Sequence, residues 1–188
     1  MTRRLGYYIS ITADGMYADE EGGLGAFEPA EDEHRYANHL VRDAGDAVMG
    51  RVMYGVMEYW DELDLDDPGT NEIERDFATF WRETPKHVVS RGEPKVGPNA
   101  AKLEGDVVEA VRAMKAADGP PIMLGAGAEL FATLSRAGLI DDYRFLVVPI
   151  ALGKGKALFA ALDEPLRLKL VATRAFPSGA VLLEYVAA

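Results

Sequence analysis

Residues 122–130 read IMLGAGAEL, and this stretch is the most informative part of the chain. Its first half is typical of a buried strand ending at Gly125, and a helix is expected to begin at Ala128. Such a turn lets backbone approach a phosphate, and the helix N-terminus adds N–H donors and a positive dipole. Leu130 stands where a dinucleotide fingerprint has its third glycine, so an ordinary tight turn explains the stretch equally well.

Two further strand ends have the same character. In AVMGRVMY a short apolar strand meets Gly50 and Arg51 at the start of a helix, and in HVVSRGEP a strand is followed by Ser90 and Arg91. Guanidinium and hydroxyl groups suit a phosphorylated ligand. Each end alone also fits an ordinary turn. Because the carboxyl ends of strands form the ligand crevice of an open α/β sheet, the three ends together predict a nucleotide site.

Strand-like and helix-like segments alternate along the chain, which predicts an α/β fold with a mixed, mostly parallel sheet flanked by helices. Neither a repeat nor a linker interrupts residues 1–188, so we expect a single domain. A tight reversal at Pro177-Ser178-Gly179 predicts a C-terminal antiparallel hairpin. Strands are expected at 5–12, 46–50, 86–91, 100–105, 121–127, 143–153, 166–176 and 180–188, helices at 31–44, 51–60, 73–83, 106–117 and 128–138, and a long loop at 13–31.

Composition excludes several functional classes. The 188 residues are 48% hydrophobic and contain no cysteine, so a sizeable core is expected without disulfides, thiol chemistry or iron–sulfur clusters, and the cytoplasm is the expected compartment. No apolar run is long enough for a membrane span. The net charge of −11 argues against nucleic-acid binding. The acids concentrate in residues 19–33 and 58–76, so the remaining chain can still hold a phosphorylated ligand, although solubility alone explains the acidity equally well.

The sequence offers little reactive chemistry of its own. The three histidines, His34, His39 and His87, form no pair at metal-ligand spacing, so we expect no metal site. A phosphate-binding GxxxxGK[ST] loop and a GxSxG nucleophile turn are also absent. A bound cofactor would therefore have to supply the chemistry.

Six motifs occur in the order and spacing of a known superfamily: ISITADGMYAD, AVMGRVMY, PKHVVSR, IMLGAGAEL, DDYRFLVVPIALGKGKALF and FPSGAVLLEY. From about Leu5 to Tyr185 the chain resembles the dihydrofolate-reductase-like proteins. Within them it is most similar to stand-alone relatives of the C-terminal reductase domain of riboflavin-biosynthesis deaminase-reductases. The resemblance implies a three-layer dihydrofolate-reductase-like fold and NADPH as hydride donor. The zinc signature of the deaminase half needs cysteines that this chain lacks.

The resemblance also implies a set of cofactor-binding positions. Two of them depart from the family pattern, because Met53 replaces a usual threonine and Ala126 interrupts adjacent glycines. The implied positions are Ser10, Tyr17 and Ala18 near the nicotinamide, Gly50, Arg51, Val52 and Met53 at the adenosine ribose and its phosphate, Ser90 and Arg91 at the adenosine end, and Gly125, Ala126, Gly127 and Ala128 at the pyrophosphate.

The substrate-binding residues follow less directly from the sequence. Dihydrofolate reductases place a carboxylate on the first helix, and an ungapped count back from Gly50 puts that position on His34, with Asp32 and Glu33 expected to point elsewhere. Folate reduction is therefore not expected. Asp14 is a candidate proton donor, although a turn-stabilising role suits it better. A planar substrate would lie between His34, Tyr36, Tyr54, Tyr59 and Trp60, although core packing explains these aromatic residues as well.

These observations favour an NADPH-dependent reductase of a small, planar heterocycle. A riboflavin-pathway aminopyrimidine reductase is the alternative enzyme, but its phosphorylated substrate needs bases, and the first helix offers only Arg35 and Arg42. A non-catalytic nucleotide-binding dimer module is the third interpretation. A homodimer through the C-terminal strands is expected, because the run from Val181 to Val186 is nearly continuously apolar.

Overall fold

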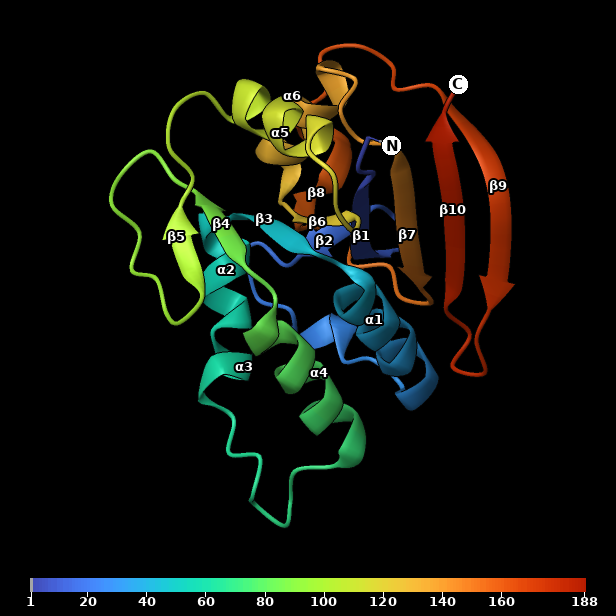
Figure 1. Ribbon diagram of the computed structural model, residues 1–188. Helices are drawn as coiled ribbons and strands as arrows, with labels where there is room; N and C mark the ends of the chain where they lie inside the picture. The colour runs from blue at the N-terminus through green and yellow to red at the C-terminus, as the bar shows by residue number, and fades with distance from the viewer. Residues whose placement is uncertain (1) are drawn as a thin grey trace. The chain divides into compact units, whose positions relative to one another are not determined.

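The computed structural model describes residues 2–188, which divide into two compact units (Figure 1). The first unit contains the chain up to Arg4 together with Glu31–Gly125, and the second contains Leu5–Ala30 together with Ala126–Ala188. Within the described residues, no helix is long and apolar enough to cross a membrane.

The first unit is built on parallel strands in the order β5-β4-β3-β6. Its long helices begin at side-chain caps. Asn71 and Glu74 form a capping box at the start of α4, and Asp106 accepts hydrogen bonds from two amides at the start of α5, as the sequence predicted for Asp106. The strands are β3 (Asp46–Gly50), β4 (Lys86–Val89), β5 (Ala100–Lys102) and β6 (Ile122–Gly125), and the helices are α1 (Glu31–Asp43), α2 (Arg51–Met57), α3 (Tyr59–Glu62), α4 (Glu72–Glu83) and α5 (Val107–Ala116).

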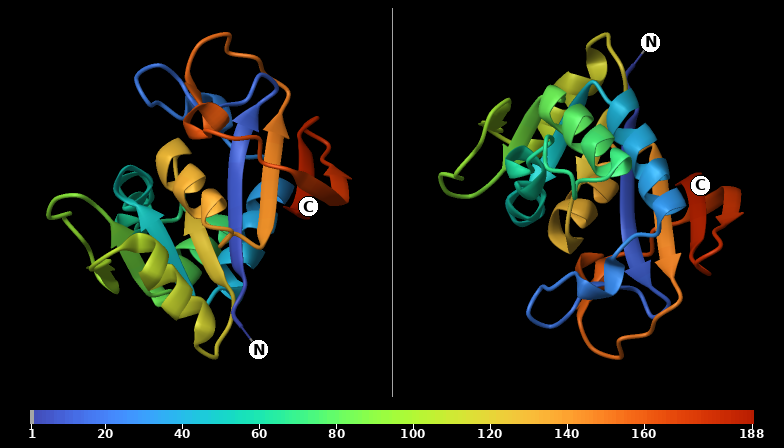
Figure 2. Two further views of the ribbon diagram at one scale, coloured as in Figure 1. Left: turned by 90° about the horizontal axis from the view of Figure 1, so that it is seen from above. Right: turned by 90° about the horizontal axis from the view of Figure 1, so that it is seen from below.

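Helices cover both faces of these strands (Figure 2). Met49 of β3 and Val88 of β4 belong to one buried cluster with Val41 of α1 and Phe77 and Trp81 of α4. The figure shows α5 over the opposite face. The predicted helix of residues 51–60 is interrupted after Met57, where the chain starts the separate short helix α3.

In the second unit, β1 pairs with β7 in parallel, and β10 pairs antiparallel with both β7 and β9. The segment 13–31, predicted as one long loop, also contains the short strand β2, which pairs with β8. The strands are β1 (Leu5–Thr12), β2 (Met16–Ala18), β7 (Asp142–Val148), β8 (Lys156–Ala157), β9 (Leu168–Ala175) and β10 (Val181–Ala187), with the helix α6 (Ala128–Arg136) and the 3-10 turns η1 (Gly25–Phe27) and η2 (Leu158–Ala161).

The core of the second unit is aromatic. Tyr7 of β1 lies 4.8 Å from Phe131 of α6, ring centroid to ring centroid, and Phe145 of β7 packs against both rings. Burial alternates along β1, so Leu5, Tyr7 and Ile9 share one buried face. This buried face of β1 packs against α6 through the contact between Tyr7 and Phe131.

The C-terminal hairpin is confirmed. Its turn is closed by hydrogen bonds from the Phe176 N–H to the Ala180 carbonyl and from the Gly179 N–H to the Phe176 carbonyl, and Gly179 has a positive φ of 91°. β9 forms the outer edge and is exposed from Lys169 to Ala175. Leu182 of the inner strand β10 is fully buried. With parallel pairs elsewhere and this antiparallel edge, the sheet is mixed and mostly parallel, as predicted.

Candidate cofactor site

Three strands of the first unit end level with one another. Gly50 of β3 stands opposite Val89 of β4, and Met49 of β3 stands opposite Gly125 of β6. These strand ends therefore lie along one edge of the parallel sheet, which is where α/β proteins bind ligands. The structure thus brings together the three strand ends that the sequence singled out.

Arg51 begins α2 directly after β3. Its guanidinium is exposed and makes no hydrogen bond or ion pair with any residue in 2–188, and the N-cap residue Gly50 has no side chain with which to cap the helix. Val52 beside it is 69% exposed, which is unusual for a valine. Met53 instead packs against the core beside Met49. An unpaired cation and an exposed apolar side chain suit a ligand with an anionic group and a flat ring.

Ser90 and Arg91 open the loop of residues 90–99 between β4 and β5. The Ser90 hydroxyl accepts a hydrogen bond from the Gly92 amide at 3.3 Å, which shapes the turn locally. Further along, the Gly97 N–H donates to the Tyr54 hydroxyl of α2 at 2.8 Å. The loop that carries Arg91 is therefore joined to the helix that carries Arg51.

Gly125 is closely packed. A methyl group at this position would meet the Met49 side chain at 2.5 Å and Met53 at 3.3 Å. The end of β6 therefore lies against the Met49 side chain of β3 and close to Met53 of α2, and a larger residue would have to displace the end of Met49. This contact supports the interpretation of Gly125 as part of a tight strand-to-helix turn.

In the second unit, the turn before α6 is held from two sides. The Tyr7 hydroxyl donates to the Ala126 carbonyl at 2.8 Å, and burial raises the pKa of Tyr7 well above its ordinary value, so this donor stays protonated. The Tyr17 ring lies over Gly127, where a methyl group would come within 3.1 Å of the hydroxyl oxygen. No side chain caps the helix that begins at Ala128. Tyr17 and Gly127, both predicted cofactor residues, are thus neighbours.

Asp14 is held as a hydrogen-bond acceptor. Its carboxylate accepts from the Thr12 hydroxyl at 2.5 Å and from the amides of Gly153 and Leu152 at 2.7 and 3.2 Å. The Thr12 hydroxyl, followed by the Gly153 amide, lowers the pKa of Asp14. The geometry therefore favours the turn-stabilising role, since a carboxyl with a lowered pKa is a poor proton donor at neutral pH. Of the remaining predicted positions, Ser10 is half-buried on β1 and Ala18 is buried on β2.

The first helix presents a different residue from the one the count selected. Glu33, expected to point elsewhere on the helix than His34, is only 3% exposed. The ring of His34 is half-buried, 5.4 Å from Trp60 and 5.5 Å from Phe77, centroid to centroid. Burial lowers the pKa of His34, which keeps the ring neutral at pH 7. The inward carboxylate of α1 is therefore Glu33.

The predicted substrate aromatics separate into two groups. Trp60 and Tyr59 lie together, with centroids 5.0 Å apart, and Tyr59 is exposed. Tyr54 is only 1% exposed, its ring packs 6.4 Å from Trp81, and its hydroxyl already accepts from the Gly97 N–H, so it belongs to the core. Tyr36 of α1 is half-buried.

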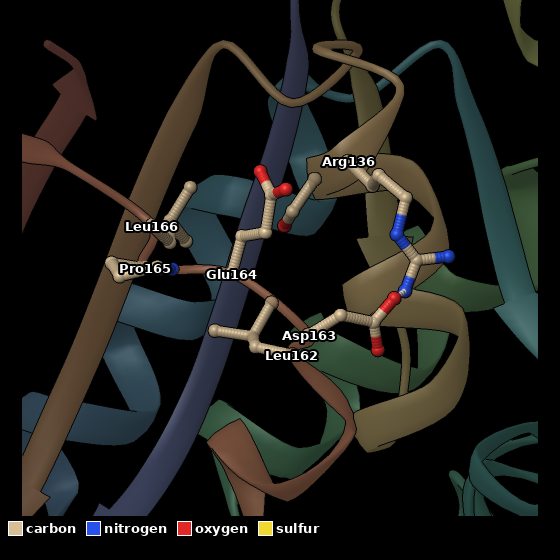
Figure 3. A pocket seen from close by; sticks show the side chains of 7 residues that line it. Arg136, Leu162, Asp163, Glu164, Pro165 and Leu166 are labelled. Carbon is tan, nitrogen blue, oxygen red and sulfur yellow. Dashed lines mark ion pairs between the residues drawn. The ribbon is translucent and has the colours of Figure 1, made fainter.

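No group of histidine and carboxylate side chains in residues 2–188 could hold a metal ion. A hollow of about 350 Å³ lies at the carboxyl end of α6, where Arg136 pairs with Asp163 beside Leu162 (Figure 3). The nine residues of α6 separate this hollow from Gly127 by about 13 Å at 1.5 Å per residue. We therefore assign the hollow no part in the cofactor site.

Sequence reasoning missed three contributors: Tyr7, Glu33 and the Tyr54–Gly97 contact. The alternation of apolar residues in LGYYISIT is a signal that could have placed Tyr7 facing inward, but its carbonyl partner lies more than a hundred residues away. The contact between Tyr54 and Gly97 likewise joins residues 43 positions apart and left no local signal.

Comparison with known proteins gives one family. The family model described as the RibD C-terminal domain matches residues 5–182. Among curated proteins, the uncharacterised protein YyaP of Bacillus subtilis (strain 168) is 33% identical over 120 residues. That match covers 64% of this chain and 62% of YyaP, so the chain spans less than two thirds of this relative.

Three solved structures share the fold. A putative riboflavin biosynthesis protein from Shewanella sp. PV-4 matches with a TM-score of 0.74 and 20% identity, over 100% of this chain and 99% of that one. The deaminase and 5-amino-6-(5-phosphoribosylamino)uracil reductase of Thermotoga maritima matches with a TM-score of 0.70 and 16% identity, over 100% of this chain and 57% of that one. A dihydrofolate reductase of Enterococcus faecalis, complexed with NADP(H), matches with a TM-score of 0.65 and 14% identity, over 100% of this chain and 99% of that one. The likenesses confirm the predicted dihydrofolate-reductase-like fold.

Proposed function

Because the chain belongs to the RibD C-terminal domain family, we propose that it is an NADPH-dependent reductase that transfers hydride to a small, planar heterocycle. The observation that carries the proposal is the level edge formed by β3, β4 and β6, with the unpaired guanidinium of Arg51 on it. A cation without a protein partner at such an edge is well suited to the phosphate of a nucleotide.

The residues present fit this cofactor. In the first unit, Arg51 and the Ser90–Arg91 pair supply two cations and a hydroxyl for a phosphorylated ribose. In the second unit, the Ala126–Ala128 turn has neither a bulky side chain nor a side-chain cap, so its amides suit a pyrophosphate. The bound cofactor would supply the hydride. The chain's part is to bind, orient and exclude water.

The substrate contacts follow from the first unit. We place the heterocycle beside Tyr59 and Trp60, whose rings offer flat apolar surface. A carboxylate accepts hydrogen bonds from ring N–H and amino groups, so Glu33 is our candidate for orienting the substrate. His34 packs among aromatic rings and is assigned no chemical step.

Reduction of a phosphoribosylated aminopyrimidine is the second candidate, since one of the structural relatives has a name with that reductase activity. Its phosphate would need bases on the substrate side. Arg35 lies 3.9 Å from Glu72, and Arg42 donates to Asp43 at 2.9 Å, so both cations of α1 already face carboxylates. This pairing favours a heterocycle without a phosphate.

We also propose that the protein is a homodimer through the β9 edge. β9 is eight residues long, and Leu170 and Val171 on it are 51% and 63% exposed. A long edge strand with two exposed apolar side chains is prone to pair with another chain, and a second copy is the simplest partner. Lys169 and Arg174, also exposed on β9, would have to find room or carboxylate partners in that interface. The cytoplasmic location expected from the composition stays a prediction.

Two measurements test the function. Calorimetric titration with NADPH and NADH should show preference for NADPH, and binding of neither, or equal affinities, contradicts the proposal. A panel of pterins including dihydrofolate, aminopyrimidines, flavins and quinones should then contain a compound that oxidises NADPH. Cofactor binding without any oxidation would favour the non-catalytic nucleotide-binding module. Oxidation only with a phosphoribosylated aminopyrimidine would favour the second candidate.

A further inference from the structure

A buried polar cluster beneath the loop of residues 90–99 has no part in the site described so far. Both carboxylate oxygens of Asp61 on α3 are buried without a hydrogen-bond partner in the described chain, and so is the indole N–H of Trp81. The Lys86 ammonium, on a residue 1% exposed, donates to the carbonyls of Trp81 and Thr84 at 2.6 and 2.9 Å. Buried polar atoms almost always have a partner, so the unpaired carboxylate needs an explanation.

Tyr54 links this cluster to the loop. Its hydroxyl oxygen accepts the hydrogen bond from the Gly97 N–H, which leaves the hydroxyl proton available to an acceptor. A methyl group at Gly97 would come within 3.3 Å of the Tyr54 hydroxyl and 3.5 Å of Asp61 Oδ2. Both oxygens therefore lie against the same point of the loop. A water molecule that hydrogen-bonds to both would join them.

The link joins two elements that carry cations. Tyr54 lies on α2 one turn after Arg51, and Gly97 lies on the loop that Arg91 opens. Burial raises the pKa of Tyr54, and the neighbouring charge of Asp61 raises it further, so the hydroxyl stays neutral and able to donate at physiological pH.

We propose that Asp61 is a positioning residue that orients the Tyr54 hydroxyl, and that the two together hold the 90–99 loop against α2 and set the separation of Arg51 and Arg91 for a phosphorylated ribose. The inference rests on the proposed NADPH-dependent function. It gives the buried carboxylate a role in cofactor selection. It also moves Tyr54 from the substrate wall predicted from the sequence to the support of the cofactor site.

Tyr54→Phe and Asp61→Asn test the inference, since each keeps the size of the side chain. The first removes the hydroxyl, and the second removes the charge and replaces one acceptor oxygen with an amide NH2. Because one hydrogen bond contributes about 1 kcal/mol, each variant should weaken NADPH binding about fivefold. NADH, which has no ribose phosphate to place, should change less than twofold. Tyr143→Phe is the matched control: Tyr143 is also buried but belongs to the second unit, so its loss should leave the NADPH-to-NADH ratio unchanged.

Amide hydrogen exchange without cofactor separates this inference from the proposed function. Both variants should accelerate exchange at Gly97 and its neighbours and leave the amides of α5 unaffected. Unchanged amide exchange in both variants would show that Tyr54 and Asp61 do not hold the 90–99 loop against α2. Faster exchange with an unchanged NADPH-to-NADH ratio would overturn their role in cofactor selection. A wild-type protein that binds neither cofactor overturns the proposed function and the role of Tyr54 and Asp61 in cofactor selection. The exchange rates still show whether these two residues hold the loop against α2.

Discussion

Two loops that follow strand ends are held by opposite kinds of contact. In the first unit, the 90–99 loop is joined to α2 by the buried, neutral hydroxyl of Tyr54. In the second unit, the 149–155 loop is joined to the turn after β1 by the exposed, ionised carboxylate of Asp14, which accepts from two loop amides. The first contact should be insensitive to pH and salt, and the second should depend on both.

The outermost strands of the two units also differ, in length and in exposed side chains. β5 of the first unit has only three residues, and the nearby Lys102 pairs with Glu93 at 2.8 Å. β9 of the second unit has eight residues and exposes Leu170 and Val171. A three-residue edge offers little backbone for pairing with another chain, whereas an eight-residue edge with exposed apolar side chains invites it even beside Lys169 and Arg174. We therefore expect the first unit to select the cofactor and the second to carry the interface.

The largest expected effect tests whether the first unit also orients the substrate. Glu33→Gln should lower the kcat of the substrate identified in the panel by about tenfold to a hundredfold, because a charge-assisted hydrogen bond contributes about 1.5–3 kcal/mol. His34→Gln is the control and should change kcat less than threefold. Steady-state kinetics measures both. A larger loss with His34→Gln than with Glu33→Gln would restore the position obtained by counting back from Gly50.

The pH profile checks the same assignment. Burial lowers the pKa of His34 below its ordinary value of 6.5, so its protonated form disappears as pH rises toward neutrality. If protonated His34 were the proton donor, kcat would fall over that range. We expect no such fall above about pH 6.5, and a profile that His34→Gln leaves unchanged.

The next effect concerns the cations at the level strand ends. Arg51→Ala should weaken NADPH binding about tenfold and leave NADH nearly unchanged, because the guanidinium is unpaired and exposed. The loss should shrink in high salt, as expected for an exposed charge. Arg112→Ala on α5 removes an equal charge from the same unit and is the control. An equal loss with both variants would show only a general effect of net charge.

Much of the fold could be predicted because its signals are local. Apolar runs that end in glycine marked β3 and β6, Asp106 marked the start of α5, and Pro177-Ser178-Gly179 marked the hairpin turn. Each is a choice made within a few residues by backbone preference or by one capping side chain.

The site could be predicted only in part, because helix rotation and long-range contacts decide it. On α1 one residue step turns a side chain by about 100°, so a count that selected His34 missed the buried Glu33 beside it. The aromatic character of Tyr54 fitted a substrate wall and a core position equally well. Its distant contact with Gly97 distinguishes the two, and a linear pattern does not show that contact.

The two sheet edges can be compared directly in solution. Light scattering at micromolar concentration should give a mass near twice 20.5 kDa. Val171→Asp should halve it while the protein stays folded, since that side chain is 63% exposed and charge on an edge strand opposes pairing. Ala101→Asp on β5 places the same charge on the other edge and should leave the mass unchanged. A wild-type mass near 20.5 kDa rejects the dimer.

The smallest expected effect is a difference in the pH dependence of Tm between the two loop contacts, at Asp14 and at Tyr54. The Thr12 hydroxyl and the loop amides lower the pKa of Asp14 below its unfolded value of about 3.9, so the carboxylate adds stability above that pH. This contribution is lost as pH falls from about 4 through the lower folded pKa. Asp14→Asn should therefore lower Tm by a few degrees at pH 7 and less at pH 3, since the wild-type protein has by then lost part of the same contribution.

Tyr54→Phe should behave in the opposite way. Because burial raises the pKa of Tyr54, its hydroxyl is neutral at both pH values, and the decrease in Tm should change less between pH 7 and pH 3 than it does for Asp14→Asn. Thermal unfolding of the two variants and the wild type, at both pH values and at low and high salt, measures the difference. Equal pH dependence for the two variants would show that Asp14 holds its loop no differently from Tyr54. A Tm difference for Asp14→Asn that grows toward acid pH would mean that the carboxylate destabilises the folded chain, against the direction of its pKa.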